Sequence, residues 1–413
     1  NKTFAGLPPL TVPYGLGINI HFFAPGQEQI FYLKMMQDAG FKLVRMDTYL
    51  APLSGNWSYR FQGYVQLARA EKNDGLRPLF ILDQVPLPQE APDTNAWKLA
   101  YAYYAGNASV QFLNYDPVWE IWNEPNPGGA GYSYWKPYPI SVFADDASAA
   151  IQRIQLVTGN KATVIAPALA GMDFSYLSSF LNGLSPVAAK DLTAVSVHPY
   201  RGSNPETVIS DYQTARQIIN ASFNFSKPIV ESEWGYSTAG VTILQQAQYY
   251  SRIYLTNLMC KVPISILYDW QDDGTNLSNG EDCFGVIQNG AQLRSDGGTL
   301  EGTAVYFIKP SYYALYETAY SLNGYTFSER VNATPYLPSY DSSFAASVYL
   351  LKFVNGGSVK YALWSTEGPI AINLPASLFS STSITLTTIF GSTTTASGPS
   401  FNVTASATPE FIS

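Results

Sequence analysis

The sequence predicts an α/β protein, a (β/α)8 barrel followed by a small, sandwich-like all-β domain. Two observations carry this prediction. From residue 15 onward short apolar runs alternate with amphipathic segments, and after residue 321 the pattern changes to β-branched and Thr/Ser-rich runs. Strands that alternate with helices over short connections indicate parallel strands joined by right-handed crossovers. We therefore expect the barrel at 1–321 and the β domain at 322–413.

The expected barrel strands are eight apolar runs, and eight strand–helix units suffice to close a barrel. Helix-like segments such as 27–40 and 59–75 lie between them and end in Gly, a common helix stop. A last helix at about 301–321 would complete the barrel. A doubly wound open sheet is the alternative, but the sequence has no GxGxxG or Walker loop. The runs are 15–22, 41–47, 77–83, 118–125, 162–170, 192–200, 227–235 and 263–270.

The C-terminal part alternates apolar and polar residues with a period of two. Its segment from 343 to 375 is interrupted at NGG and TEGP, which are turn-forming sequences. Such short alternating runs are typical of an antiparallel sandwich. A Thr/Ser-rich stalk is the alternative, but the regular apolar positions favour a folded sheet.

Composition excludes several classes of protein. Of 413 residues 46% are hydrophobic, 15% aromatic and only 13% charged, which is the opposite of a disordered chain. The net charge of −8, with 23 scattered Lys and Arg, argues against nucleic-acid binding. No run of 18 apolar residues occurs, so we expect no membrane span.

Cysteine and histidine are too scarce for a typical metal site. Cys260 and Cys283 are the only two cysteines, and the chain has two histidines. They exclude a Cys-rich or His-rich zinc centre. The two cysteines could form one disulfide or remain two buried thiols. We expect neither a metal nor an organic cofactor, and the oligomeric state stays open.

The Asn-X-Ser/Thr acceptor pattern recurs along the chain, which favours an extracellular protein with N-linked glycans. An acidic habitat is the alternative explanation for the low charge, because carboxylates lose their charge there. Both explanations place the protein outside the cell. The pattern begins at Asn1, Asn56, Asn107, Asn220, Asn224, Asn276, Asn332 and Asn402.

Function in such a barrel lies at the carboxyl ends of the strands. Glu124 closes the fourth run and Glu233 the seventh. A retaining glycosidase needs such a pair about 5–5.5 Å apart, one group protonated and the other ionised. The other polar or aromatic residues that close the runs are His21, Arg45, Asp83, Asn123, His198, Tyr200, Trp234 and Trp270.

Two motifs resemble clan A retaining glycoside hydrolases, closest to the family 5 and family 39 group with a C-terminal β-module. They are WNEP at 122–125 and SEWG at 232–235. The resemblance implies that Glu124 is the acid/base, that Asn123 binds the sugar 2-hydroxyl and that Glu233 is the nucleophile.

The same resemblance, which covers roughly residues 15–320, implies supporting roles in other runs. Tyr200 in His198-Pro-Tyr200 would hydrogen-bond the nucleophile, Arg45 in LVRMD would keep it ionised, and Trp270 would floor the sugar subsite. A neighbouring cation, Arg45, and a phenol donor, Tyr200, also favour the charged form of the Glu233 carboxylate. An ionised neighbour and nearby tryptophans (Trp119, Trp122 and Trp234) should raise the pKa of Glu124.

Several of these residues have structural alternatives. Glu231 shares a strand face with Glu233, and Glu120 with Glu124, but both lie one layer deeper and are expected to pair with interior polar groups. His21 and His198 could be core histidines, and Asp83 could cap a turn. Asp269, Asp272 and Asp273 could bind sugar hydroxyls or Ca²⁺, although a hydrogen-bonded loop is favoured. The aromatic loop residues Tyr132, Tyr134 and Trp135 could form a sugar platform or pack onto a neighbouring loop.

The sequence therefore predicts an extracellular retaining β-glycoside hydrolase that acts on a β-linked polysaccharide or its oligosaccharides, with endo-β-glucanase action as the first expectation. An exo-acting β-glucosidase or β-xylosidase is the alternative within this class. A non-catalytic carbohydrate-binding surface protein on the same barrel is the alternative from another class.

Overall fold

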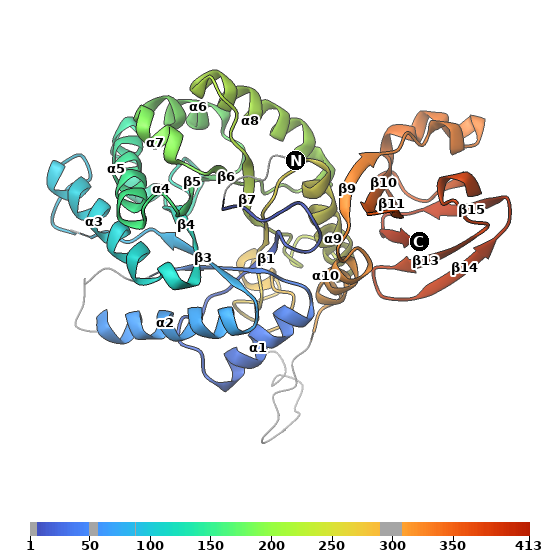
Figure 1. The fold of residues 1–413 in the computed structure, drawn as a ribbon, viewed down its shortest axis with the longest axis horizontal. Helices are drawn as coiled ribbons and strands as arrows, with labels where there is room; N and C mark the ends of the chain where they lie inside the picture. The colour runs from blue at the N-terminus through green and yellow to red at the C-terminus, as the bar shows by residue number, and fades with distance from the viewer. Residues whose placement is uncertain (1–5, 49–56, 87, 290–307) are drawn as a thin grey trace.

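The computed structural model describes residues 6–48, 57–86, 88–289 and 308–413 (Figure 1). Eight parallel strands close into a barrel in sequence order, which confirms the predicted fold class. Each strand falls within one of the predicted apolar runs. The strands are β1 (Leu16–Asn19), β2 (Leu43–Asp47), β3 (Arg77–Leu82), β4 (Val118–Ile121), β5 (Thr163–Ala170), β6 (Ala194–His198), β7 (Ile229–Trp234) and β8 (Ser265–Leu267).

Helices form the outer layer of the barrel (Figure 1). At the start of α9, Thr242 Oγ1 accepts a hydrogen bond from the Gln245 N–H, and the Gln245 side chain accepts one from the Thr242 N–H, which forms a capping box. The predicted last helix appears as α10, and its expected residues before 308 lie outside the described residues. The helices are α1 (Gln27–Asp38), α2 (Trp57–Asn73), α3 (Asn95–Gln111), α4 (Tyr132–Trp135), α5 (Ile140–Thr158), α6 (Phe174–Gly183), α7 (Pro186–Asp191), α8 (Val208–Phe223), α9 (Ile243–Met259) and α10 (Pro310–Ser321).

The barrel interior is apolar at its amino end and polar at its carboxyl end. A separate buried cluster fills the amino end, and Leu7 of the N-terminal segment closes it. Because successive strand residues alternate between the interior and the helix layer, this arrangement leaves the carboxyl end for polar side chains. The cluster consists of Leu7, Leu43, Leu79, Val118, Ile165, Ala194, Val230, Ile264 and Ile266.

The C-terminal strands form an antiparallel, sandwich-like domain. A six-stranded sheet in the order β14-β13-β16-β11-β10-β9 faces the pair β12-β15, and buried residues such as Leu350 and Phe401 fill the space between them. The strands are β9 (Thr326–Arg330), β10 (Val348–Asn355), β11 (Ser358–Ser365), β12 (Ile370–Pro375), β13 (Ser383–Thr388), β14 (Thr393–Ser397), β15 (Ser400–Ala405) and β16 (Glu410–Ile412).

The barrel and the C-terminal domain share a core. Helices α9 and α10 lie between them (Figure 1), and Trp364 and Phe411 belong to the same buried cluster as the barrel. The indole N–H of Trp364 donates to Glu206 at 2.6 Å, and Glu206 also pairs with Arg252 of α9 at 2.7 Å. The two parts are therefore joined by buried polar contacts as well as by apolar packing.

Cys260 and Cys283 are free thiols, so the disulfide alternative is wrong. Cys260 follows α9 and precedes β8, whereas Cys283 lies in the loop after β8. The two residues thus flank opposite ends of the strand, which is why they do not meet. Among the described residues no helix has the length and apolarity that a membrane span requires.

Candidate active site

A pocket of about 530 Å³ opens at the carboxyl ends of the barrel strands. This size is in the usual range for a small-ligand site. Polar and aromatic residues form most of it, and small residues of the β4 and β5 loops form one side. The lining consists of Asn19, His21, Arg45, Asp47, Ile81, Asn123, Glu124, Gly128, Gly129, Ala130, Ala170, Gly171, Tyr200, Glu233, Tyr268, Glu281 and Phe284.

The backbone after β4 is bent to present Glu124. Trp122 and Glu124 have φ values of 64° and 49°, a left-handed conformation that costs a non-glycine residue on the order of 1–3 kcal/mol. The following loop packs tightly against this bend. A Cβ at Gly129 would lie 2.5 Å from the Glu124 Cβ, and one at Gly131 would lie 2.0 Å from the Asn123 carbonyl oxygen. The glycines of NPGGAG therefore allow the loop to hold the bend.

Glu124 and Glu233 face each other across the pocket, as predicted. Their nearest carboxylate oxygens and the His198 ring lie within 4.8 Å of one another. The two carboxylates are 13% and 12% exposed, so both can reach a bound molecule. This spacing agrees with the short separation of retaining glycosidases and not with the 6.5–9.5 Å of inverting ones.

Arg45 organises the floor of the pocket. Its Nη1 lies 2.5 Å from Glu233 Oε2 and its Nε lies 2.7 Å from Glu120 Oε2. Its Nη2 donates to Asn123 Oδ1 at 2.8 Å. Burial alone would lower the pKa of Arg45, but the carboxylates of Glu120 and Glu233 raise it well above the ordinary value. Arg45 therefore stays charged beside Glu233, as predicted.

Tyr200 and His198 hold the two glutamates separately. The Tyr200 hydroxyl donates to Glu233 Oε1 at 2.7 Å, as the His-x-Tyr motif implies. His198 is fully buried, with Nδ1 2.9 Å from Glu124 Oε1 and Nε2 3.1 Å from Ser232 Oγ. His198 is thus a polar contact of Glu124 rather than only a core residue.

The expected rise in the pKa of Glu124 is wrong. Burial raises this pKa, but the contact with His198 and the hydrogen bond from the Ala130 N–H outweigh burial and lower it. The nearby tryptophans do not oppose this, because Trp119 and Trp122 pack among other aromatic rings, with Phe80 and Tyr134. Glu124 instead meets hydrogen-bond donors.

The deeper glutamates are structural, as predicted. Glu120 is fully buried against Arg45. Glu231 is also fully buried, and its Oε2 accepts from Ser265 at 3.1 Å and from Asn257 at 3.2 Å. Burial raises the pKa of Glu231 well above its usual range. A carboxyl group in that state cannot replace Glu233 as an ionised nucleophile.

Three predicted aromatic site residues lie in the core instead. Trp270 is 1% exposed and packs between Tyr32 of α1 and Tyr312 of α10. Tyr268 lines the pocket in its place. The strand β8 ends at Leu267, so Trp270, which closes the predicted apolar run, lies in the loop beyond the strand.

The other two aromatic predictions fail for similar reasons. Trp234 is fully buried, because strand alternation turns it away from the side of Glu233 and toward Arg201 and Tyr236. Trp135 is 3% exposed and packs against Trp97. Packing of the aromatic loop, the alternative interpretation, is therefore correct for Trp135.

His21 lies at the pocket rim and contacts the acidic loop. Its Nε2 is 3.3 Å from Asp269 Oδ2, and although burial lowers its pKa, Asp269 raises it to about 9. Burial raises the pKa of Asp269 to about 7. Asp272 pairs with buried Lys309 at 2.6 Å and accepts a hydrogen bond from the Gly285 N–H, which is the expected role in a hydrogen-bonded loop.

Four polar pocket residues were missed by sequence reasoning: Asn19, Asp47, Tyr268 and Glu281. Asp47 carried a signal, since it lies two residues after Arg45 on the same face of β2. Asn19 is the last residue of β1, and the predicted His21 lies beyond that strand. Tyr268 and Glu281 lie beyond β8. No periodic pattern marks such a loop position.

The fold and the paired glutamates define a class, the retaining glycoside hydrolases of clan A. The profile described as "Cellulase (glycosyl hydrolase family 5)" matches residues 15–273. The chain belongs to glycoside hydrolase family 5. No curated protein sequence matches it.

Solved structures share the fold of nearly the whole chain. A family 39 glycoside hydrolase from Bacteroides cellulosilyticus WH2 has a TM-score of 0.74 at 19% identity, over 97% of this chain and 81% of that one. A glucosidase from Croceicoccus marinus has a TM-score of 0.65 at 13% identity, over 99% and 97%. A family 30 subfamily 8 xylanase from Clostridium acetobutylicum has a TM-score of 0.61 at 13% identity, over 98% and 97%.

Proposed function

We propose that this retaining glycoside hydrolase cleaves β-glycosidic bonds in a polysaccharide of neutral sugars, with an endo-β-glucanase-like action. The observation that carries the assignment of roles is the facing pair Glu124 and Glu233, with oxygens within 4.8 Å and different partners. Glu233 is held by Arg45 and Tyr200, whereas Glu124 is held by His198 and the Ala130 N–H.

The proposed reaction has two displacements. Glu124 donates a proton to the leaving glycosidic oxygen while Glu233 attacks the anomeric carbon, which gives a covalent glycosyl-enzyme. Glu124, now ionised, takes a proton from water, which attacks the same carbon and releases Glu233. Formation of the ester removes the negative charge of Glu233, which no longer opposes the charge of Glu124.

Neutral sugars are favoured by the charge of the pocket. Four carboxyl groups line it, from Asp47, Glu124, Glu233 and Glu281, against the two basic side chains of His21 and Arg45. Arg45 is already paired with carboxylates. A uronic acid would add a further negative charge at close range, which costs binding free energy.

A sugar chain as leaving group is favoured by the small residues beside Glu124. Gly128, Gly129 and Ala130 line the pocket from the β4 loop, and Ala170 and Gly171 line it from the end of β5. Such residues project no large side chain into the space next to the proton donor. This supports action within a polysaccharide, and an exo-acting β-glucosidase or β-xylosidase is the alternative that product analysis distinguishes.

The roles are tested with Glu233→Ala and the matched control Glu231→Gln on the same strand. Glu233→Ala should lose hydrolysis of an aryl β-glucoside, and azide should restore turnover to an α-glycosyl azide. Glu231→Gln should keep activity per folded molecule. Azide rescue of a Glu231→Ala variant, with none for Glu233→Ala, would reverse the assignment.

The substrate is tested by the products formed from a panel of β-glucans, xylans and mannans. Endo action predicts an early fall in viscosity and a ladder of oligosaccharides from β-glucan. Release of monosaccharide alone from chain ends would replace the endo proposal by the exo alternative and leave the catalytic roles intact.

We also propose that the protein acts outside the cell. Support comes from the described acceptor asparagines, all of which are exposed: Asn107, Asn220, Asn224, Asn276, Asn332 and Asn402. Asn1 and Asn56 lie outside the described residues. A decrease in mass after endoglycosidase treatment of the natural protein would support the glycan explanation, and an unchanged mass would favour the acid-habitat explanation.

A further inference from the structure

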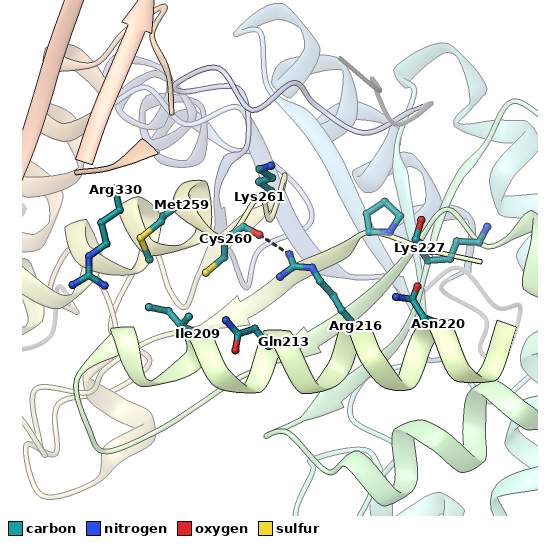
Figure 2. A pocket seen from close by; sticks show the side chains of 11 residues that line it. Ile209, Gln213, Arg216, Asn220, Lys227, Met259, Cys260, Lys261 and Arg330 are labelled. Atoms are coloured by element: carbon teal, nitrogen blue, oxygen red, sulfur yellow. Dashed lines mark hydrogen bonds between the residues drawn. The ribbon is translucent and has the colours of Figure 1, made fainter. Parts of the chain in front are cut away.

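A second groove lies at the opposite end of the barrel from the active site, with a volume of about 600 Å³ (Figure 2). Helix α8 forms one wall, and the segment 259–261 before β8 forms the other. Residues 226–228 lead into β7, and Arg330 comes from β9 of the C-terminal domain. The groove therefore joins the two parts of the chain at the amino ends of the barrel strands.

The groove is strongly basic. Arg216, Lys227, Lys261 and Arg330 line it, and no carboxylate stands among its lining residues. The remaining lining is neutral: Ile209, Gln213, Asn220, Ser226, Pro228, Met259 and Cys260. This concentration of cations is unexpected in a chain with 31 acidic and 23 basic residues.

These cations have no carboxylate partner within 4.0 Å among the described residues, and Arg216, Lys227 and Arg330 donate to backbone carbonyls instead. Arg216 donates to the Cys260 carbonyl at 2.5 Å, and Arg330 to the Ala346 carbonyl at 2.6 Å. Lys227 donates to the carbonyls of Lys190 and Leu192. Burial lowers the pKa of Lys227, and Asp191 opposes this only through space. Carbonyl oxygens orient the cations but do not neutralise them.

The cations are also spread along the groove rather than gathered at one point. Figure 2 shows Arg330 toward one end, Arg216 and Lys261 in the middle and Lys227 toward the other end. A single small anion cannot pair with charges at both ends, whereas an extended chain with repeated negative groups can. The side chains of Ile209 and Met259 add apolar surface on which a sugar ring can lie.

We propose that this groove binds a segment of an anionic polysaccharide, whose carboxylate or sulfate groups pair with Arg216, Lys261 and Arg330. The site is distinct from the catalytic pocket, whose acidic lining disfavours the same ligand. It would hold the enzyme on an acidic polymer while the pocket acts on neutral chains nearby. If the groove does not bind such a polymer, the proposed hydrolase function is unaffected.

Binding is tested with the full chain produced without N-linked glycans, because Asn220 lines the groove and a glycan there would compete with the hexamer. A galacturonic acid hexamer should bind with an affinity that falls as salt rises, and a neutral galactose hexamer should not bind. A sulfated galactan hexamer distinguishes the two sources of negative charge. Tighter binding of either acidic hexamer supports the site, and equal binding of the neutral and acidic hexamers would overturn it.

Lys261→Gln locates the binding, since this exposed side chain has no ion pair among the described residues. The variant should weaken binding roughly threefold, and a further Arg330→Gln change should weaken it roughly tenfold. The matched control is Lys161→Gln, an exposed lysine that also precedes a barrel strand. Equal affinity of the Lys261 and Lys161 variants would overturn the proposal.

Cys260 supplies a local readout that does not depend on mutation. Its half-buried thiol lines the groove, whereas the Cys283 thiol is buried elsewhere. The bound acidic hexamer should slow alkylation of Cys260 by a maleimide without changing the rate at Cys283. An unchanged rate at Cys260 under saturating hexamer would place the binding elsewhere and overturn the proposal.

Discussion

The two ends of the barrel differ in whether their charged side chains are buried and paired. At the carboxyl end, Arg45 is buried and contacts Glu120, Glu233 and Asn123. At the amino end, Lys261 and Arg330 are exposed beside a groove without carboxylates. Buried charges that are paired fix the geometry of reacting groups, whereas exposed charges without a carboxylate partner can pair with a ligand. The difference predicts large effects of substitution at the first end and small ones at the second.

The largest effect is expected from Arg45→Met. The change leaves Glu120 and Glu233 buried without their cation, so it should destabilise the fold by about 3–5 kcal/mol. The kcat/KM of the remaining folded protein should fall ~10³-fold or more. Urea unfolding and hydrolysis of an aryl β-glucoside measure the two losses.

Arg252→Met is the matched control, because Arg252 is equally buried and pairs with Glu206 away from the pocket. It should lose comparable stability yet keep activity per folded molecule. If both variants lose activity equally, Arg45 acts only through stability and the contrast between the two ends disappears.

Tyr200→Phe should act on the reaction rather than on the fold. It removes the hydrogen bond to Glu233 and should lower kcat/KM about 10²-fold. Tyr361→Phe removes an equivalent hydroxyl, which donates to the Leu378 carbonyl in the C-terminal domain, and should leave kcat/KM unchanged. A loss of less than twofold in Tyr200→Phe would contradict the role of Tyr200.

The pH profile should report the partners of Glu124. Because its pKa is lowered and it must be protonated to act, the alkaline limb of kcat/KM should lie at low pH. His198→Asn removes a cause of the lowering and should move that limb up by about one pH unit. Ser232→Ala, which removes only the contact at Nε2, should leave the limb in place. No movement in His198→Asn would show that the histidine does not set this pKa.

Stability should decline as pH rises, because of buried carboxyl groups at the carboxyl end of the barrel. Burial, with the neighbouring Asp47, raises the pKa of Asp83 to about 8. A raised folded-state pKa contributes stability that is present below the unfolded pKa of about 4 and is lost as pH rises through 8. Asp83→Asn should remove at least about 1 kcal/mol of the loss between pH 5 and pH 9. An unchanged pH dependence of Tm would contradict this.

The smallest effect on stability is expected at the basic groove. Lys261→Gln should change the free energy of unfolding by no more than about 0.5 kcal/mol, because the lysine is exposed and makes no ion pair with a described residue. A loss above 1 kcal/mol would mean that this charge is structural, and the contrast with the carboxyl end would be weaker.

Sequence patterns predicted the strands and most of the site residues correctly where the backbone forms regular strands. The strand runs located β1 to β8, and the ends of β2, β4, β6 and β7 supplied Arg45, Glu124, His198 and Glu233. Position along the strand also separated Glu124 and Glu233 from Glu120 and Glu231, which share their strand faces but lie one layer deeper. These assignments depend only on position along a regular element.

Two of the errors, at Trp270 and in the pKa of Glu124, lie where regular structure ends, whereas Trp234 lies within β7 and alternation along that strand turns it away from Glu233. Trp270 follows the last residue of β8, so its direction depends on how the loop folds against α1 and α10. The lowered pKa of Glu124 depends on His198 and on the Ala130 N–H, which reaches Glu124 because the loop packs against it at Gly129. Such contacts are set by tertiary packing and leave no periodic trace in the sequence.

The hydrogen bond from Trp364 to Glu206 has a consequence for the whole chain. A protein cut after residue 321 would leave the Glu206–Arg252 pair open to solvent and expose the barrel surface that Trp364 and Phe411 now cover. The β domain is therefore not an independent module that can be removed without affecting the barrel. We expect the barrel and the β domain to melt together in one calorimetric transition, and a related enzyme could exchange its β domain only by exchanging Glu206 and Arg252 with it.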